Sequence, residues 1–434
     1  MDFQHSPESL RLRSRLEAFI ARFVLPYNAA WHRSVQEGVF PPLFMEDLKS
    51  LARDEGLWNL FLPGLRDSEP GTRVSNLDYA PLAESMGRVP WASEVFNCNA
   101  PDTGNIELLH RFATPDQAAR WLVPLLEGDI RSAFAMSEPD VASSDPTNLQ
   151  TTVRRDGPEL VLNGRKWFIT GAAHPRCRLL IVMARDAAGD RGHDKENEND
   201  SHARHSMVLV PIDTPGVGVV RNIPVLHHVA PEGHCEILLR NVRVPADHLL
   251  GAWGAGFAMA QARLGPGRIH HCMRTIGQCE LALELASERV LERRAFGKYL
   301  ADFSNVQDWI AESRIEIDQA RLLVLQAAWA LDQESPDRAS MKAQIAAIKV
   351  VAARLQTRVV DRAMQIFGAM GLSPDTPLAW FFSWGRALHL MDGPDEVHLR
   401  TVARAELARA RARMGAGSAY FTTPEQLEAP PRLR

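Results

Sequence analysis

Apolar residues recur at helical spacing in the first part of the chain. Between Ser9 and Val24 the apolar residues at helical spacing include Leu10, Leu16, Phe19, Ile20 and Phe23. A spacing of three or four residues places such side chains along one face of a helix. Proline and glycine, as in Leu62-Pro63-Gly64, separate this run from the next ones. The pattern predicts a helical N-terminal domain over residues 1–129.

The pattern changes near residue 130 and indicates a second domain, over residues 130–250. Short runs rich in β-branched and aliphatic residues lie there, at 160–162, 179–183, 207–210, 217–220 and 236–239. Turn residues lie between many of these runs, as in Asp156-Gly157-Pro158, and Asn163-Gly164 is interpreted as a hairpin turn. Short strands at this spacing predict a small β domain.

An insert at 186–206 interrupts the β pattern. It is rich in Asp, Glu, Asn, His and Arg and has almost no large apolar side chains. A segment with so little to bury is expected to be a flexible hairpin loop. Its histidines His193, His202 and His205 could suggest a metal site, but the composition favours a solvated loop.

Helical periodicity returns over residues 251–413. The clearest case is Ser340 to Met370, where Ile345, Ile348, Ala352, Leu355 and Val359 form one apolar stripe. Two further amphipathic runs extend from Cys272 to Glu292 and from Val306 to Asp332, and Pro336 separates two of the three. Long helices with short connections predict a bundle. The tail at 414–434 contains several glycines and prolines and is expected to cross the surface.

Length and composition narrow the class of protein. A chain of 434 residues suggests two or three domains, and 45% apolar with 24% charged residues is typical of a soluble globular protein. A net charge of −4 gives no reason to expect nucleic acid or a membrane surface as a partner. Five cysteines without C-x-x-C spacing predict free thiols in a reducing compartment and no metal site. No apolar run is long enough to span a membrane, and Met1 to Leu10 does not resemble a signal peptide, so we expect a cytoplasmic enzyme.

Two clusters in the β domain could bind a ligand. In Ala133 to Pro139 a run of small residues ends in a proline-containing loop, followed by hydroxyls at 142–145. Main-chain donors in such a loop could hold a planar polar ligand, or the loop could be a plain strand exit. At Trp167, Phe168 and Thr170, aromatic faces precede a hydroxyl that could donate to a flavin edge. Both aromatic residues could instead belong to the core, but strand alternation would place them on opposite faces.

Two clusters in the helical region could likewise be either functional or purely structural. Arg293 and Arg294 end a long helix, where arginine either binds a pyrophosphate or interacts with the helix dipole. Asp392 lies in the loop before a helix that begins near Asp395 and Glu396. If apolar neighbours shielded it, its pKa would rise and it could act as a base; otherwise it is a turn or N-cap residue. The adjacent pairs His227-His228 and His270-His271 are given no metal role.

Together, the four clusters resemble the acyl-CoA dehydrogenase family in order and spacing, from about residue 10 to residue 413. The segments Glu138 to Asp145 and Asp392 to His398 resemble the branch that in animals is fused to a phosphotransferase-like domain. The resemblance implies an α+β fold with a helical N-terminal domain, a small middle β-barrel and a C-terminal four-helix bundle.

The resemblance also implies roles for individual residues. Asp392 takes the position of the catalytic base, which is glutamate in many members, and no metal is implied. The residues that correspond to FAD contacts are Phe134, Met136, Ser137, Phe168, Thr170, Arg293, Phe303, Gln365, Gly368, Ala369, Pro394 and Glu396. Those that correspond to substrate contacts are Ser144, Arg268, Gly393 and Arg404. Three departures stand out: Phe168 replaces a usual tryptophan, Ala369 a usual glycine and Pro394 a usual Thr or Ser.

The implied activity is flavin-dependent α,β-dehydrogenation of an acyl-CoA thioester to a trans-2-enoyl-CoA, as in fatty acid β-oxidation. The resemblance further implies a homodimer or homotetramer, with an electron-transferring flavoprotein as the electron acceptor. Three alternatives remain open: an acyl-CoA oxidase-like enzyme, an enzyme acting on hydroxylated or phosphorylated acyl-CoA, and a catalytically silent helical binding or scaffold protein. A flavin spectrum of the purified protein would exclude the last.

Overall fold

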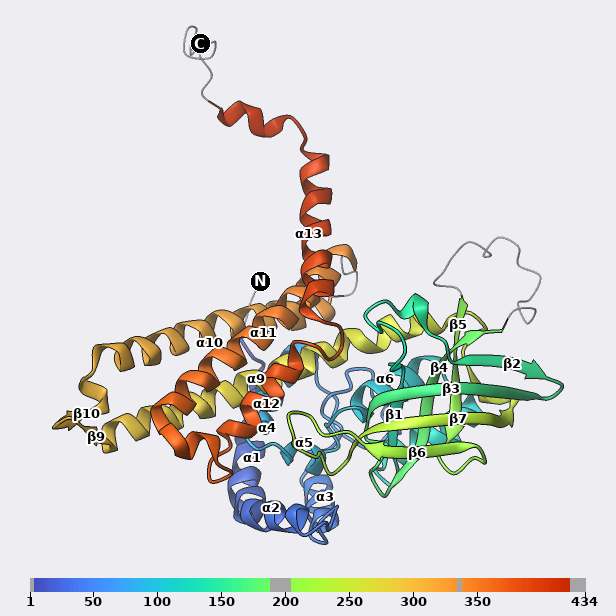
Figure 1. Ribbon diagram of the computed structural model, residues 1–434, viewed down its shortest axis with the longest axis horizontal. Helices are drawn as coiled ribbons and strands as arrows, with labels where there is room; N and C mark the ends of the chain where they lie inside the picture. The colour runs from blue at the N-terminus through green and yellow to red at the C-terminus, as the bar shows by residue number, and fades with distance from the viewer. Residues whose placement is uncertain (1–3, 188–203, 334–337, 422–434) are drawn as a thin grey trace.

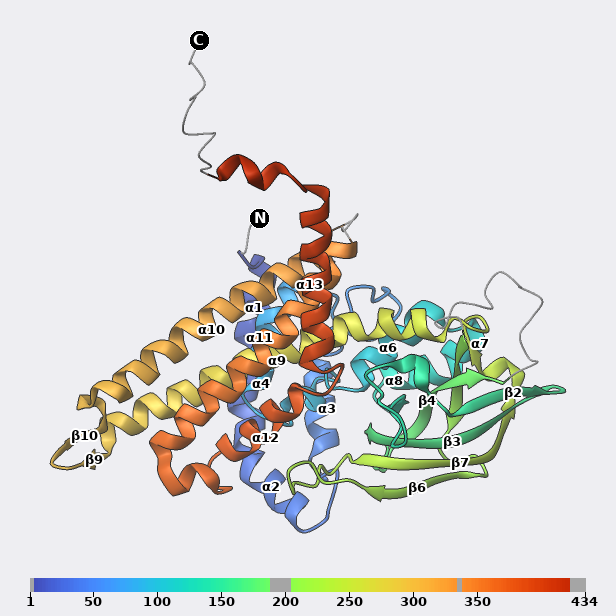
Figure 2. The same ribbon diagram turned by 45° about the horizontal axis from the view of Figure 1, so that its top comes forward.

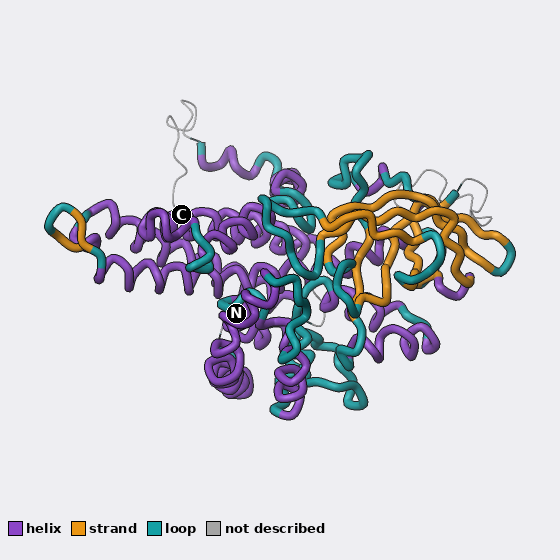
Figure 3. Tube along the Cα trace, turned by 60° about the horizontal axis from the view of Figure 1, so that its bottom comes forward, coloured by secondary structure: helices purple, strands orange, loops and turns teal. Residues whose placement is uncertain are grey.

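The computed structural model describes residues 4–187, 204–333 and 338–421 (Figure 1). Helices from the first part of the chain lie beside a β domain, and long helices from the last part extend away from it. Figure 3 shows the strands gathered at one end of the molecule and the long helices at the other. Most of the predicted insert (188–203) and most of the predicted tail (422–434) lie outside the described residues.

The N-terminal part is helical, as predicted. The first helix begins at Pro7, where the Ser6 side chain accepts a hydrogen bond from the Ser9 N–H and so caps it. A π-helical turn at 20–24 continues it. The helices are α1 (Pro7–Phe19), α2 (Asn28–Gln36), α3 (Met45–Asp54), α4 (Asn76–Gly87), α5 (Ala92–Val95), α6 (Asp102–Phe112), α7 (Pro115–Gln117) and α8 (Val123–Leu126).

The middle part is a β domain, as predicted, and its strands form one eight-stranded sheet. The order is β6-β7-β3-β2-β4-β5-β8, and β1 pairs in parallel with β4. Alternate residues of the strands pack into a core of their own. The strands are β1 (Arg131–Ala135), β2 (Thr152–Asp156), β3 (Glu159–Thr170), β4 (Cys177–Asp186), β5 (His205–Pro211), β6 (Val217–Asn222), β7 (His234–Pro245) and β8 (Leu249–Leu250).

The predicted hairpin turn at Asn163-Gly164 is wrong, because both residues lie inside β3. The register between β3 and β7 shifts between Leu162 and Gly164, which marks a bulge. Gly164 has φ +159, and a Cβ there would come within 2.3 Å of the Thr151 hydroxyl. The glycine therefore permits a close approach of two strands, and the hairpin between β2 and β3 turns at Gly157 instead.

The C-terminal part is helical. Its long helices are α9 (Gly256–Glu292), α10 (Ser304–Leu331) and α11 (Arg338–Phe367), followed by α12 (Leu378–Leu388) and α13 (Asp395–Ala412). A small hairpin of β9 (Arg294–Ala295) and β10 (Lys298–Tyr299) joins α9 to the rest. Figure 2 shows α13 projecting away from the other helices. None of the described helices is both long and apolar enough to cross a membrane.

The crossing of α4 over α9 fixes the position of α9. Gly87 faces the backbone of Arg274, and Gly277 faces the backbone of Glu84; a Cβ at Gly277 would come within 1.8 Å of the Glu84 carbonyl oxygen. Only glycines permit so short a distance between two helix backbones. Arg321 of α10 donates to the Glu84 carboxylate at 3.1 Å and ties a third helix to this crossing.

Candidate active site

Asp392 lies in a tight turn between α12 and α13. Its φ is +56, in the left-handed region that residues other than glycine seldom adopt. Two side chains hold its carbonyl oxygen: Arg268 Nε donates at 2.9 Å and His398 Nε2 lies at 3.3 Å. Pro394 is the N-cap of α13, which rules out the alternative that Asp392 caps this helix. Within the described residues, no hydrogen bond uses the backbone N–H of Asp392 or Gly393.

The carboxylate of Asp392 is surrounded by cations. Its side chain is 22% exposed, and Oδ2 lies 3.4 Å from Nε2 of His271. Burial alone would raise its pKa, but His271, Arg263, Arg268 and Lys349 together hold the pKa below its usual value. The condition of apolar shielding with a raised pKa is therefore not met: Arg263, Arg268 and Lys349 are cations, so Asp392 is ionised at neutral pH.

Sequence reasoning missed His271, which belongs to α9. Burial and the nearby Arg274 lower its pKa to about 3, so the ring is neutral. A guanidinium nitrogen of Arg274 lies 3.2 Å from its Nδ1. The signal available in the sequence was the spacing of Arg268, His271 and Arg274, three residues apart, which places all of them on one face of a helix.

Lys349 on α11 is a second residue that sequence reasoning missed. Its side chain is fully buried, and its ammonium group donates to the Leu388 carbonyl at the end of α12. A cation at a helix C-terminus is favoured by the helix dipole. Burial lowers the pKa of Lys349. Among the acids around it, Asp392 has the strongest electrostatic interaction with its ammonium group.

The loop after β1 presents the first predicted ligand cluster. Met136 and Ser137 are half-buried, and the Ser137 carbonyl accepts from the Trp167 N–H at 3.0 Å. The preceding Phe134 lies under the guanidinium of Arg263, 4.2 Å from its ring centroid. Because Arg263 also acts on Asp392, this aromatic residue links the loop of the β domain to the surroundings of the candidate base.

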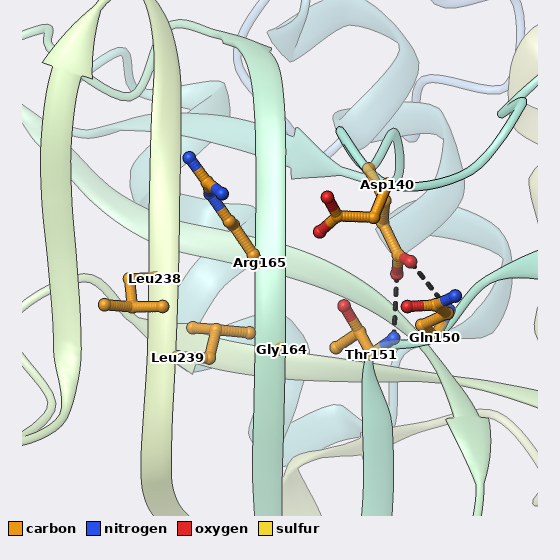
Figure 4. Close-up of a pocket in the computed structure, with 8 residues that line it drawn as sticks. Asp140, Gln150, Thr151, Gly164, Arg165, Leu238 and Leu239 are labelled. Atoms are coloured by element: carbon orange, nitrogen blue, oxygen red, sulfur yellow. Dashed lines mark hydrogen bonds between the residues drawn. The ribbon is translucent and has the colours of Figure 1, made fainter.

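A buried ion pair holds this loop in place. Lys166 Nζ lies 2.8 Å from Glu138 Oε1 and donates to the Met136 carbonyl at 2.9 Å. The Glu138 carboxylate also accepts from the N–H groups of Gln150 and Thr151 (Figure 4). Burial lowers the pKa of Lys166 to about 8, whereas Lys166 holds the Glu138 pKa below its usual value. The hollow beside this pair, about 300 Å³ and lined partly by Asp140 and Arg165, is too small for a dinucleotide.

The second ligand cluster departs from regular strand geometry. Phe168 has φ +51, and the register of β3 on β7 shifts between Lys166 and Ile169. As a result Trp167 and Phe168 do not alternate across the sheet; their rings touch at 4.9 Å between centroids. Phe168 is 44% exposed, so it is not a core residue. Thr170 Oγ1 lies 3.0 Å from Nδ1 of His234.

A third group of predicted FAD contacts lies at the other end of the molecule. Arg293 is exposed and ends α9, and Gln365, Gly368 and Ala369 are exposed where α11 ends. The two helix ends adjoin, because Arg289 lies 5.5 Å from the Phe367 ring centroid. Figure 1 shows this end far from the β domain. The half-buried Phe303 follows β10 and carries Lys298 over its ring at 3.9 Å. One chain therefore does not bring these residues to Met136 or Phe168.

The remaining predicted residues lie in the turn of Asp392, on α13 and in the loop after β1. Gly393 follows it with φ +102, and a Cβ there would lie 3.0 Å from His398 Nε2. Glu396 is exposed in the first turn of α13, and Arg404 is exposed further along the same helix. Ser144 is exposed in the loop between β1 and β2. In the part of the chain that the structure describes, no group of three potential metal ligands occurs, and all five cysteines are free and buried.

Comparisons with known proteins agree along most of the chain. Family models for the acyl-CoA dehydrogenase N-terminal, middle and C-terminal domains match residues 6–129, 133–242 and 254–407. The probable acyl-CoA dehydrogenase FadE2 of Mycobacterium tuberculosis is 52% identical over 425 residues, which cover 96% of this chain and 99% of the relative.

Two further similarities concern a longer relative and a solved structure. Mouse acyl-CoA dehydrogenase family member 10 is 47% identical over 407 residues, which cover 93% of this chain but only 37% of that protein. A solved structure from Mycobacterium abscessus, provisionally named an acyl-CoA dehydrogenase, is 47% identical and superposes with a TM-score of 0.86. The alignment covers 94% of this chain and 99% of that one.

Proposed function

The chain belongs to the acyl-CoA dehydrogenase family, and from that premise we propose that it dehydrogenates an acyl-CoA thioester between Cα and Cβ, with Asp392 as the base. One observation carries the proposal: the carboxylate of Asp392 is mostly buried, and side chains of α9 and α13 hold its turn in place. The left-handed backbone of Asp392 and the two side chains on its carbonyl fix the place from which the carboxylate acts.

Members of this family bind FAD, and the residues of this chain fit that group. The ring of Phe168 is exposed in a strained backbone conformation, and Thr170 follows it with a hydroxyl. Met136 and Ser137 lie on the loop that Lys166 fixes to β3. These four residues would hold the flavin ring, with Phe134 behind them and Pro394 and Glu396 on the side of α13. When bound, FAD supplies the acceptor for the β-hydride.

The chain itself supplies the proton chemistry. Asp392 accepts the α-proton on its carboxylate. Because its pKa is low, the carboxylate is already ionised at neutral pH, but it is a weak base. A weak base needs a more acidic substrate. The backbone N–H groups of Asp392 and Gly393, which make no hydrogen bond among the described residues, would bind the thioester oxygen and stabilise the enolate charge. Arg268 holds the same turn and would line the substrate side, with Ser144 and Arg404 further along the CoA.

The group at the far end of the bundle supports a proposal about assembly. Arg293, Phe303, Gln365, Gly368 and Ala369 cannot reach the flavin cluster of their own chain. We infer a homodimer or homotetramer in which they contact the FAD of a neighbouring subunit, where Arg293 would bind the pyrophosphate. An electron-transferring flavoprotein is the proposed electron acceptor.

The charges around Asp392 favour a second candidate within the same site. Arg263, Arg268 and Lys349 all interact with Asp392 more strongly than with any other anion. The buried Arg263 and Lys349 and the half-buried Arg268 leave an excess of positive charge around this carboxylate, which costs free energy unless a ligand offsets it. A hydroxylated or phosphorylated acyl chain would supply a polar or anionic group there.

One anaerobic experiment tests the proposed function. The purified protein is mixed with unsubstituted acyl-CoAs of increasing length and with hydroxylated and phosphorylated acyl-CoAs, and the visible flavin band is followed. Loss of the band with unsubstituted acyl-CoA supports dehydrogenation. Conversion of the phosphorylated analogue without lasting bleaching would favour the second candidate. A protein without flavin, or one that no acyl-CoA bleaches or converts, would contradict both.

A further inference from the structure

Helix α9 contacts Asp392 at two points. Arg268 Nε binds the backbone carbonyl of Asp392 at 2.9 Å, and His271, one turn further along, lies 3.4 Å from its carboxylate. Both residues lie on one helix, which is itself fixed by its glycine contacts with α4. The turn and the carboxylate of Asp392 are therefore located by the same rigid element.

The partner of His271 determines which nitrogen of its ring carries the proton. Arg274 can only donate hydrogen bonds, so Nδ1, at 3.2 Å from its guanidinium, must accept. A neutral ring then has its single proton on Nε2, the atom that lies nearest the Asp392 carboxylate. Protonation of the ring is suppressed because His271 is buried beside Arg274. The arrangement presents an N–H, and not a lone pair, to the candidate base.

We propose that His271, held by Arg274 in the tautomer with the proton on Nε2, is a positioning residue that orients the carboxylate of Asp392. The inference rests on the proposed function of Asp392 as the base. The distance of 3.4 Å is longer than a well-formed hydrogen bond, and such contacts commonly tighten when substrate binds. A short aspartate side chain benefits most from this restraint, because a small rotation takes its oxygen out of reach of the α-carbon.

The proposal makes two linked expectations for His271→Leu. The limiting rate of flavin reduction should fall about tenfold or more, because the carboxylate loses its orientation. The acid midpoint of that rate should also rise by about half a pH unit to one unit, because an N–H donor favours the ionised carboxylate. The charged or titratable groups that face Asp392 and remain in this variant are Arg263, Arg268, Cys272, Arg274, Lys349 and His398.

His271→Gln is the matched control, because its amide N–H can occupy the place of Nε2–H. We expect it to keep the wild-type rate within about threefold and the wild-type midpoint. A double-mutant cycle tests the role of Arg274. Arg274→Met should slow flavin reduction when His271 is present, because the ring then loses its fixed tautomer. The same substitution should not change the rate of His271→Gln, since an amide has no tautomer to select.

The experiment is anaerobic single-turnover flavin reduction by a saturating acyl-CoA across the acidic pH range, with FAD content and acyl-CoA affinity measured for each variant. An unchanged rate and midpoint in His271→Leu would overturn the proposal, as would His271→Gln being as slow as His271→Leu. If His271→Leu does not retain FAD, the Arg274→Met cycle decides: equal losses in both backgrounds overturn the proposal. The proposed function fails separately, if wild-type protein is not reduced or Asp392→Asn is reduced normally.

Discussion

At the scale of single residues, the candidate base is controlled by charge rather than by apolar burial. Burial raises the pKa of Asp392, and the cations around it more than offset that effect. The carboxylate is consequently ionised before substrate arrives, and its activity must fall as the pH drops through its pKa. The contribution of each neighbouring cation to this pKa can be measured from the pH dependence of flavin reduction in single variants.

Replacing Lys349 by methionine should move the acid limb of flavin reduction to higher pH, by about one unit. The sign follows from the charge: a nearby cation favours the ionised carboxylate, so its loss raises the pKa of Asp392 and protonation begins at a higher pH. The midpoint is read from single-turnover rates. Lys342→Met, at an exposed position on the same helix, is the control and should leave it unchanged. Equal midpoints in Lys349→Met and wild type would exclude this role.

The buried pair of Lys166 and Glu138 predicts an effect on stability. Lys166→Met should lower the free energy of unfolding by about 3–5 kcal/mol, because Glu138 is left buried without its cation. Adding Glu138→Gln removes the unpaired charge and should restore part of the loss. Urea unfolding measures both. If the single variant were as stable as wild type, the pair would have no role in holding the flavin loop.

These residue contacts could not be predicted from the sequence. Lys166 and Glu138 come from separate strands and loops, and His271 meets Asp392 only because α9 crosses the turn before α13. Periodicity predicts that a residue is buried but not which charge it meets. The positions of Asp392, Met136 and Thr170 were predicted as candidates by resemblance. Of the cations that set the pKa of Asp392, only Arg268 was named, as a substrate contact, whereas Arg263 and Lys349 were not.

At the scale of elements, periodicity predicted the long helices and most strands. It placed α10 and α11 within a few residues of their observed bounds. It missed the first part of α9, which begins at Gly256 and not near Cys272, because Gly265-Pro266-Gly267 hides the helical pattern. It also predicted a hairpin at Asn163-Gly164, since a bulge and a turn use the same residue types.

The crossing of α4 and α9 gives a test at this scale. Gly277→Ala should destabilise the fold by about 1–3 kcal/mol, because the new methyl group would overlap the Glu84 carbonyl. Gly267→Ala is the control on the same helix, where a Cβ meets nothing within 4 Å and helix propensity favours alanine. Thermal unfolding compares the two. Equal melting temperatures would mean that the close crossing does not constrain α9.

At the scale of the whole molecule, the predicted FAD contacts fall into two groups at opposite ends (Figure 1). One group lies on the β domain, together with Pro394 and Glu396 at the start of α13, and the other lies where α9 and α11 end. A single chain cannot use both groups on one cofactor, so an assembly of two or more chains accounts for them best. The exposed Phe296, in the hairpin beside Arg293, is a further apolar side chain at that end.

Mixed assemblies test whether one subunit completes the site of another. Arg293→Glu alone should lose FAD, and Asp392→Asn alone should bind FAD without being reduced. Hybrids made by unfolding and refolding the two together should regain acyl-CoA-dependent flavin reduction, because the intact Asp392 of one chain meets the intact Arg293 of the other. Homogeneous refolded samples of each variant are the controls. If the hybrids remain inactive, Arg293 of one subunit does not complete the FAD site of its neighbour.

The most direct test of the central claim is the single-turnover rate of flavin reduction in Asp392→Asn under anaerobic conditions. Asparagine keeps the size of the side chain and leaves the carbonyl contacts of Arg268 and His398 possible, so FAD content and acyl-CoA affinity should stay close to wild type. An amide oxygen is a very weak base, and we predict a loss of about 100-fold to 10,000-fold in rate. Flavin reduction at a near wild-type rate, with a saturating acyl-CoA, would contradict the assignment of Asp392 as the base.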